Sequence, residues 1–148
     1  MQDSSADDRL GFLTALVRYE TLLWNDLDAA LKAEHLPSMS EVWALRVIEG
    51  LPGSARVQDL RRALAITVGA ASKFVDRLER SGLVRRVPHP SDRRSSILVL
   101  TDSADEQLRT ATRIVESRLA ERIPDGWSDA ARLEALIARV ELTPSAGQ

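Results

Sequence analysis

The sequence predicts a mainly helical domain with one small β-hairpin. Over most of the chain, apolar residues recur at steps of three and four, the spacing of a helix's buried face. Between residues 83 and 101 the spacing changes to two, which is typical of strands. With 148 residues, 44% of them hydrophobic and 28% charged, residues 1–148 have the size and composition of a single globular domain.

The first predicted helix runs from Leu10 to Leu31, about six turns. Asp7 and Asp8 stand near its amino end, where the helix dipole favours negative charge. The helix must end before Pro37, because a residue that precedes proline avoids the helical region. Its apolar stripe consists of Leu10, Leu13, Leu16, Val17, Leu23, Trp24, Leu27 and Leu31.

A second helix is expected to begin at the capping-box pair Ser38 and Glu41 and to end at Gly50. The sequence Leu51-Pro52-Gly53-Ser54 then has the composition of a turn. A third, short helix fits residues 57–64.

Thr67 is the predicted N-cap of a fourth helix, which runs to about Ser81. Gly82 follows in the position of a left-handed C-cap. The third and fourth helices are joined by Ala65-Ile66, and the pair has the dimensions of a helix-turn-helix.

Two strands, residues 83–87 and 96–101, are predicted to form a hairpin. Residues 88–95 are expected to connect them as a long charged loop. Beyond the hairpin, a fifth helix ends at Pro124 and a sixth begins at its N-cap Ser128.

Charge is distributed unevenly along the chain, whose net charge is −2. Residues 53–95 carry ten basic and four acidic side chains, whereas the remaining residues carry ten basic and eighteen acidic ones. Nearly all of the basic residues are arginine, which suits phosphate and guanine, although a GC-rich genome would also produce this excess. We expect the basic segment to face nucleic acid.

Several functional classes are excluded at this stage. The chain has no cysteine, and therefore no disulfide framework and no thiolate metal site. Because no apolar run reaches the roughly 18 residues of a membrane span and no signal peptide is recognisable, we expect a cytoplasmic protein without a membrane partner. His35 and His89 are far apart in sequence and have no metal-ligand spacing around them. With no glycine-rich phosphate loop either, we expect neither enzymatic activity nor a metal or cofactor.

The fourth predicted helix has an exposed face suited to the major groove of DNA. Near its amino end the exposed residues are small, and long cations follow one and two turns later. Gly69 would cost about 1 kcal/mol in helix propensity, which close approach to a base or phosphate would offset. A solvated helix face that tolerates the glycine is the alternative. The candidate contacts are Thr67, Gly69, Ala70, Ser72, Lys73 and Arg77.

The predicted hairpin loop carries Asp92, Arg93 and Arg94. Two guanidinium groups at a loop tip are suited to the minor groove, where narrow A·T tracts concentrate negative potential. Asp92 would hold Arg94 in position through a charge-assisted hydrogen bond. The alternative is a hydrophilic turn in which Asp92 only favours the turn. The helix-turn-helix just before the hairpin favours contact with DNA.

Two motifs resemble the MarR family of bacterial winged-helix regulators. VDRLERSGLVRR, residues 75–86, resembles the end of that family's recognition helix, and DRRSSILVLT, residues 92–101, resembles its wing. The length and the order of six helices fit the family over nearly the whole chain. Ala104 stands where the family usually has glycine, and residues 68–70 are less polar than in many relatives. Contact with thymine methyl groups and shape readout would then outweigh direct hydrogen bonds.

The resemblance implies a homodimeric, winged helix-turn-helix regulator of transcription. Residues 39–101 would form the DNA-binding lobe, residues 8–35 and 102–141 the dimerisation helices, and residues 143–148 a frayed tail. The fourth helix would read the major groove and Arg94 the minor groove. Terminal helices that fold back on their own lobe are the alternative to a dimer. We expect a repressor bound to a pseudo-palindromic operator, the alternative being a module that binds an acidic protein instead of specific DNA.

Trp24 and Trp43 lie where the first two helices should face each other, and Tyr19 and His35 are near them in sequence. Many MarR-like proteins bind a small aromatic or anionic effector in this region. The resemblance therefore implies a ligand that releases DNA by favouring a second shape of the dimer. The alternative is that these aromatic side chains simply belong to the core.

Overall fold

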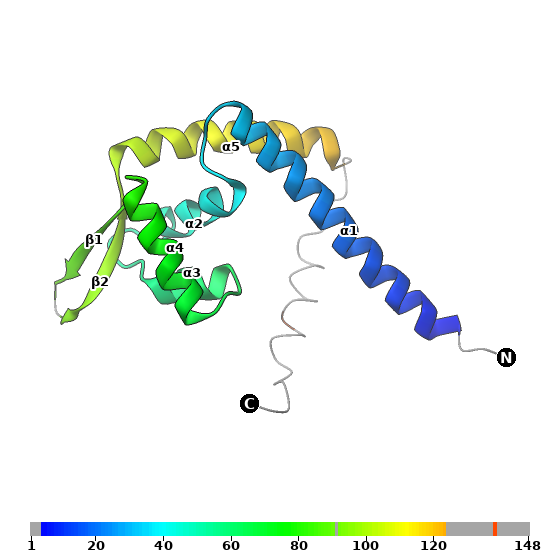
Figure 1. Ribbon diagram of the computed structural model, residues 1–148, viewed down its shortest axis with the longest axis horizontal. Helices are drawn as coiled ribbons and strands as arrows, with labels where there is room; N and C mark the ends of the chain where they lie inside the picture. Colours follow the sequence, from blue (N-terminus) through cyan, green and yellow to red (C-terminus); the bar gives the residue numbers. More distant parts are fainter. Residues whose placement is uncertain (1–3, 91, 124–137, 139–148) are drawn as a thin grey trace. The chain divides into compact units, whose positions relative to one another are not determined.

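The computed structural model describes residues 4–90, 92–123 and 138 (Figure 1). In chain order the elements are α1 (Ser4–Ala33), α2 (Met39–Glu49), α3 (Val57–Ala63), α4 (Val68–Arg80), β1 (Val84–His89), β2 (Asp92–Leu100) and α5 (Asp102–Arg122). The predicted fold class, mainly helical with one antiparallel hairpin, is confirmed. The sixth helix predicted from Ser128 and the tail from residue 143 lie outside the described residues.

The chain divides into two compact units, Met1–Glu116 and Ser117–Gln148, and α5 passes from the first into the second. In the second unit, Arg118 and Glu121 form an ion pair of 3.4 Å on the surface of α5. Within the described ranges, no helix is long and apolar enough to cross a membrane.

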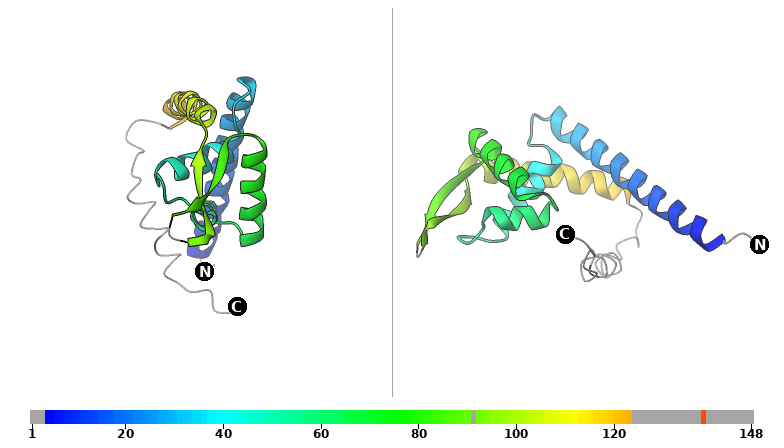
Figure 2. Two further views of the ribbon diagram at one scale, coloured as in Figure 1. Left: turned by 90° about the vertical axis from the view of Figure 1, so that its left-hand side faces the viewer. Right: turned by 60° about the horizontal axis from the view of Figure 1, so that its bottom comes forward.

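The core of the first unit draws one fully buried leucine from each of α1, α2, α3, α4, β2 and α5. These are Leu31, Leu45, Leu60, Leu78, Leu98 and Leu108. Burying a leucine contributes about 1.5–3 kcal/mol, so these contacts fix the helices and the hairpin to each other. The strands extend from this core away from the helices (Figure 2).

α2 begins as the sequence predicts. The Ser38 N–H donates to Glu41 Oε2 at 2.9 Å, and the Glu41 N–H donates to Ser38 Oγ at 3.4 Å, which confirms the capping box. A carboxylate of α1 joins this cap, because Asp28 Oδ1 accepts the Met39 N–H at 2.5 Å. The amino end of α2 is therefore tied both to itself and to α1.

Three helices end at a residue in the left-handed conformation, and Gly82, φ 71°, is the one that the sequence predicts. The others are His35, φ 55°, after α1 and Ala65, φ 51°, after α3. Each is followed by an N–H that reaches back five residues to close the helix. These bonds join Leu36 to Leu31 (3.0 Å), Ile66 to Arg61 (3.1 Å) and Leu83 to Leu78 (3.0 Å).

The hairpin is longer than predicted. Val84 pairs with Leu100 at its base, Pro88 with Ser96 further out, and His89 with Asp92 at its end. The expectation of a loop over residues 88–95 is therefore wrong. A proline fits an edge strand wherever its nitrogen need not donate to the ladder, and the register is irregular directly after Pro88. A ribbon that extends away from the core also has no buried face at its end, so it shows no apolar alternation there.

Thr101 joins the hairpin to the helices on either side of it. Its hydroxyl donates to the Gly82 carbonyl at 2.7 Å, and its N–H donates to the Leu83 carbonyl at 3.2 Å. The same hydroxyl accepts the Ala104 N–H at 3.1 Å and so caps α5. Ala104 is fully buried, and α5 begins normally without the glycine that the family resemblance leads one to expect.

Candidate nucleic-acid interface

α4 exposes the side of the helix that the sequence predicts. Thr67 Oγ1 accepts the Ala70 N–H at 3.2 Å and caps the helix. Ala71, Val75 and Leu78 are buried, while Phe74, also predicted to be buried, is half-exposed. The exposed residues include six of the candidate contacts: Thr67, Gly69, Ala70, Ser72, Lys73 and Arg77.

The amino end of α4 is open to close approach. A Cβ added at Gly69 would meet no atom within 4 Å, so nothing in the fold requires glycine there. Val68, the first residue of the helix, is 66% exposed, which is unusual for so apolar a side chain. The end of α4 thus presents small and apolar groups to solvent, without long side chains to block contact.

The two cations of α4 differ in their surroundings. The guanidinium of Arg77 lies over the ring of Phe74, 4.7 Å from its centre. Arg77 Nε is also 3.7 Å from Glu41 Oε1 of α2, an ion pair too long for a hydrogen bond. Lys73 is exposed, and no ion pair or hydrogen bond of its side chain is found among the described residues. Arg77 is therefore partly held in place, whereas Lys73 points freely to solvent.

The predicted tip residues Asp92, Arg93 and Arg94 begin β2 instead of lying in a loop. The backbone of Asp92 pairs with His89 at the end of the hairpin. Only the backbone of these three residues is described, so the predicted bond between Asp92 and Arg94 remains a prediction.

Sequence reasoning missed a cluster of charges that links the hairpin to α4. Arg86 of β1 donates from Nη1 to Glu79 Oε2 at 2.5 Å and from Nη2 to Asp76 Oδ1 at 2.6 Å. Its backbone N–H also donates to Glu79 Oε1 at 3.2 Å. Desolvation lowers the pKa of Arg86, but the hydrogen bonds and charges of both carboxylates outweigh it and raise the pKa above its usual value. The guanidinium therefore stays charged.

The two carboxylates were detectable in part from the sequence. Asp76 and Glu79 are three residues apart and must share one side of α4. Their common partner comes from another element, and nothing in local spacing identifies it. We call Asp76, Glu79 and Arg86 the hairpin clamp.

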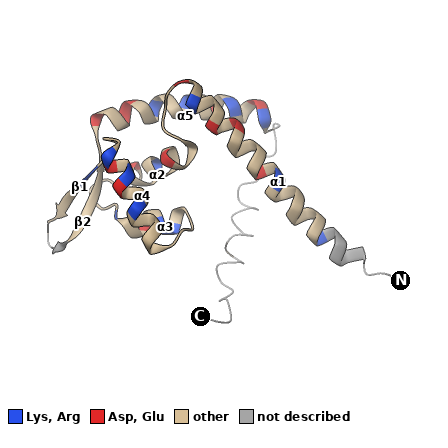
Figure 3. Ribbon diagram, viewed as in Figure 1, with Lys and Arg blue, Asp and Glu red and all other residues tan. Residues whose placement is uncertain are grey.

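Positive charge gathers on α3, α4 and β1. Figure 3 shows blue and red segments in turn along α4, where Asp76 and Glu79 interrupt the basic residues. Both acids are paired in the clamp, so the surface they share with the exposed cations is effectively basic. The exposed cations of these elements are Arg61, Arg62, Lys73, Arg77, Arg80 and Arg85.

The candidate effector residues do not form one cluster. The rings of Trp24 and Trp43 lie 5.8 Å apart at 49°, so α1 and α2 meet there as predicted. Trp43 is 42% exposed and borders a cavity of about 400 Å³ between α2 and α5. His35 lines a different hollow, of about 460 Å³, beside Lys32, and Tyr19 lies on α1 with 38% of its surface exposed. The cavity at Trp43 is lined by Met39, Val42, Trp43, Arg46, Val47, Thr112, Val115 and Glu116.

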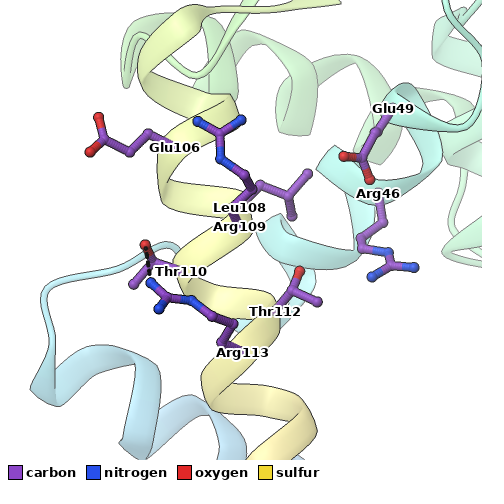
Figure 4. A pocket seen from close by; sticks show the side chains of 8 residues that line it. All are labelled: Arg46, Glu49, Glu106, Leu108, Arg109, Thr110, Thr112 and Arg113. Atoms are coloured by element: carbon purple, nitrogen blue, oxygen red, sulfur yellow. Dashed lines mark hydrogen bonds between the residues drawn. The ribbon is translucent and has the colours of Figure 1, made fainter.

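A neighbouring cavity of about 620 Å³ lies between the end of α2 and α5 (Figure 4). Arg46, Arg109 and Arg113 line it, but their guanidinium groups point in different directions. Glu49 and Glu106 also line it. Its charges therefore do not converge on one anion. No group of three or more metal-ligating residues occurs in the described part of the chain.

The sequence model of the MarR family matches residues 36–95, from the start of α2 into the hairpin. None of the curated proteins matches the sequence. The structure is similar to that of the transcriptional regulator BldR from Sulfolobus solfataricus, with a TM-score of 0.77 and 24% identity over 97% of this chain and 100% of that one.

It is also similar to the transcriptional repressor CouR bound to a 23-mer DNA duplex, with a TM-score of 0.71 and 26% identity over 86% of this chain and 89% of that one. CouR from Rhodococcus jostii RHA1 bound to p-coumaroyl-CoA gives a TM-score of 0.72 and 20% identity over 99% of this chain and 100% of that one. The sequence of residues 36–95 thus matches the MarR family, and the chain shares the winged-helix fold of these solved structures.

Proposed function

We propose that the protein regulates transcription by binding double-stranded DNA through α4 and the hairpin. The observation that carries this proposal is the open amino end of α4, where the fold does not require Gly69 and cations follow at Lys73 and Arg77. A helix in the major groove needs this order of small residues and long donors. Thr67 and Ser72 supply hydroxyl groups, and Arg94 reaches the minor groove from the wing. CouR binds a DNA duplex with this fold at 26% identity.

The primary test is selection of DNA from a random-sequence library by the full-length protein. We expect a pseudo-palindromic duplex to be enriched, with affinity that falls steeply as salt rises, because phosphate contacts release counterions. Arg94→Ala should weaken binding strongly at fixed salt. If the library yields no sequence and the salt dependence is flat, the alternative is favoured, a winged-helix module that binds an acidic protein.

Gly69→Ala tests close approach of α4 to DNA. Alanine should stabilise the helix by up to about 1 kcal/mol and at the same time weaken binding to the selected duplex, because its methyl group occupies the space of the approaching base or phosphate. Gly11→Ala in α1 is the matched control, because a Cβ there also meets no atom within 4 Å. Equal affinities for the two variants would contradict close approach at Gly69.

Val68 offers a chemical test of what α4 reads. Its exposed side chain is suited to the methyl group of thymine, the apolar contact available in the major groove. Replacing a contacted thymine by uracil removes only that methyl group. Wild-type protein should lose affinity for the uracil duplex and Val68→Ala should not. An equal loss in both proteins would place the contact elsewhere.

The protein is proposed to act as a homodimer, with residues 8–35 and 102–141 as its dimerisation region and residues 39–101 as its DNA-binding lobe. α1 supports this proposal, because several of its large apolar side chains are exposed. They are Leu10, Phe12, Leu13, Leu16, Val17, Tyr19 and Leu22. Two copies related by a two-fold axis would match the symmetry of a palindromic operator. A regulator of a bacterial chromosome works in the cytoplasm, which is the compartment we propose.

Repression relieved by a small aromatic or anionic ligand completes the proposal. The cavity beside Trp43 supports it, and CouR binds p-coumaroyl-CoA with this fold. A ligand can release DNA only if it favours one shape of the dimer over another. Tryptophan fluorescence titrated with phenolic and carboxylate compounds should therefore change together with DNA affinity. No activity as an enzyme and no cofactor are part of the proposal.

A further inference from the structure

The hairpin clamp joins two elements that the proposed function uses separately. Asp76 and Glu79 lie on α4, and Arg86 lies on β1. Three hydrogen bonds cross from one element to the other at 2.5, 2.6 and 3.2 Å. The strands extend away from the helical core and pack against it only at their base, where Val84, Ile97 and Leu98 are buried (Figure 2). Arg86 pairs with Leu98 within this base, so the clamp adds directional hydrogen bonds to α4 beside the apolar packing.

We propose that Arg86 is a positioning residue, which sets the angle of the hairpin relative to α4 so that both can contact one DNA duplex. This inference rests on the proposed function. A bidentate guanidinium fixes direction as well as distance, because both of its outer nitrogens are engaged by carboxylates. α4 and the hairpin must meet two adjacent grooves at once, and a hairpin that swings freely would lose entropy on each binding event.

Arg86 is not itself suited to contact DNA. Its side chain is 29% exposed, and both outer nitrogens are already hydrogen-bonded. Arg85, its neighbour, points to the opposite side of the strand and is exposed. Arg85 therefore provides the matched control, since its loss removes the same charge from the same strand and leaves the clamp intact.

The first experiment measures affinity for the duplex that the wild-type protein selects from a random library, across a series of salt concentrations. Arg86→Gln should bind about tenfold more weakly, while the slope of log affinity against log salt concentration (the salt slope) stays unchanged. Arg86→Lys should recover part of the lost affinity. Arg85→Gln should lose less, and any loss should appear as a smaller salt slope. A salt slope reduced by about one in Arg86→Gln would mean that Arg86 touches a phosphate, which overturns the proposal.

A second comparison separates positioning from simple masking of charge. In the triple variant Asp76→Asn, Glu79→Gln, Arg86→Gln, no carboxylate is left to repel DNA. Positioning predicts that this variant stays weak, whereas recovery of wild-type affinity would show that Arg86 only neutralises two acids. Arg94→Ala should also cost less in the Arg86→Gln background than in the wild type, because a misdirected hairpin has already lost that contact. Additive losses would contradict the proposal.

A third measurement needs no DNA and so remains decisive if the proposed function fails. The chain has no cysteine, so Pro88→Cys on β1 gives one site for a nitroxide label. In the wild type, the paramagnetic broadening of the α4 amide signals should fit one position of the labelled hairpin. In Arg86→Gln, the broadening should be an average over several hairpin positions. Identical broadening in both proteins would show that Arg86 does not fix the hairpin. If the broadening is averaged in Arg86→Gln but the random library yields no duplex, Arg86 still positions the hairpin, and the proposed DNA binding is wrong.

Discussion

At the scale of single residues, three helix ends have a residue in the left-handed conformation, and the sequence predicts only one of them. Glycine marks the end of α4 at Gly82, because glycine adopts positive φ without steric cost. His35 and Ala65 adopt the same conformation, which costs an L-residue about 1–2 kcal/mol. Nothing in their residue types announces that conformation. Both residues are exposed, and the conformation accompanies the backbone bonds from Leu36 to Leu31 and from Ile66 to Arg61.

Ala65→Gly should raise the free energy of unfolding by about 0.5–1 kcal/mol. The substitution removes the cost of a left-handed alanine, which exceeds the entropy that glycine adds to the unfolded chain. Gly82→Ala should lower the free energy of unfolding by about 1 kcal/mol. This cost comes from the backbone alone, since the new methyl group meets no atom within 4 Å. Urea unfolding at one fixed protein concentration measures both.

Ala29→Gly on the exposed surface of α1 is the control for these two variants. Its backbone is helical, so glycine should destabilise the protein there by about 1 kcal/mol. The sign of the same alanine-to-glycine change thus reverses between positions 29 and 65. A loss of stability in Ala65→Gly comparable to that in Ala29→Gly would contradict the strain at Ala65.

At the scale of elements, local chemistry predicted several helix ends and the hairpin, but not how far the strands of the hairpin extend. Ser38, Glu41 and Thr67 cap their helices as the sequence indicates, because a cap needs only neighbours within three residues. The strands extend past the predicted loop at residues 88–95, since ladder bonds depend on the opposite strand and not on local polarity. The hairpin clamp was missed for the same reason, since Arg86 lies seven and ten residues from its partners.

Thr101→Val should destabilise the protein by about 2 kcal/mol. Valine matches the shape of threonine but loses the hydroxyl that caps α5 and donates to the Gly82 carbonyl. Thr101→Ser keeps both hydrogen bonds and should cost less than about 1 kcal/mol. Thermal unfolding of the three proteins compares them. Equal melting temperatures for the valine and serine variants would show that the hydroxyl contributes nothing at this junction.

At the scale of the whole molecule, the net charge of −2 is the sum of a basic segment, residues 53–95, and a more strongly acidic remainder. Six exposed cations lie on α3, α4 and β1, and the two acids of α4 are paired with Arg86. The acidic excess lies outside residues 53–95 and includes residues of α1 and α5 (Figure 3). An acidic surface away from the interface repels DNA and so limits non-specific wrapping. The proposed dimer would place two basic surfaces against one duplex.

Phe12→Glu tests whether a second copy covers α1. Phe12 is 62% exposed, and an interface that covers it would have to bury the new carboxylate without a partner, which is strongly unfavourable. We expect the wild type to be a dimer and Phe12→Glu a monomer by size-exclusion chromatography with light scattering. Asn25→Glu adds the same charge at an exposed position of α1 and should remain dimeric. The monomer should also bind the selected duplex at least about 100-fold more weakly, because it loses the effective concentration that links two half-sites. If Phe12→Glu remains a dimer, the exposed apolar side chains of α1 are not covered by the second copy.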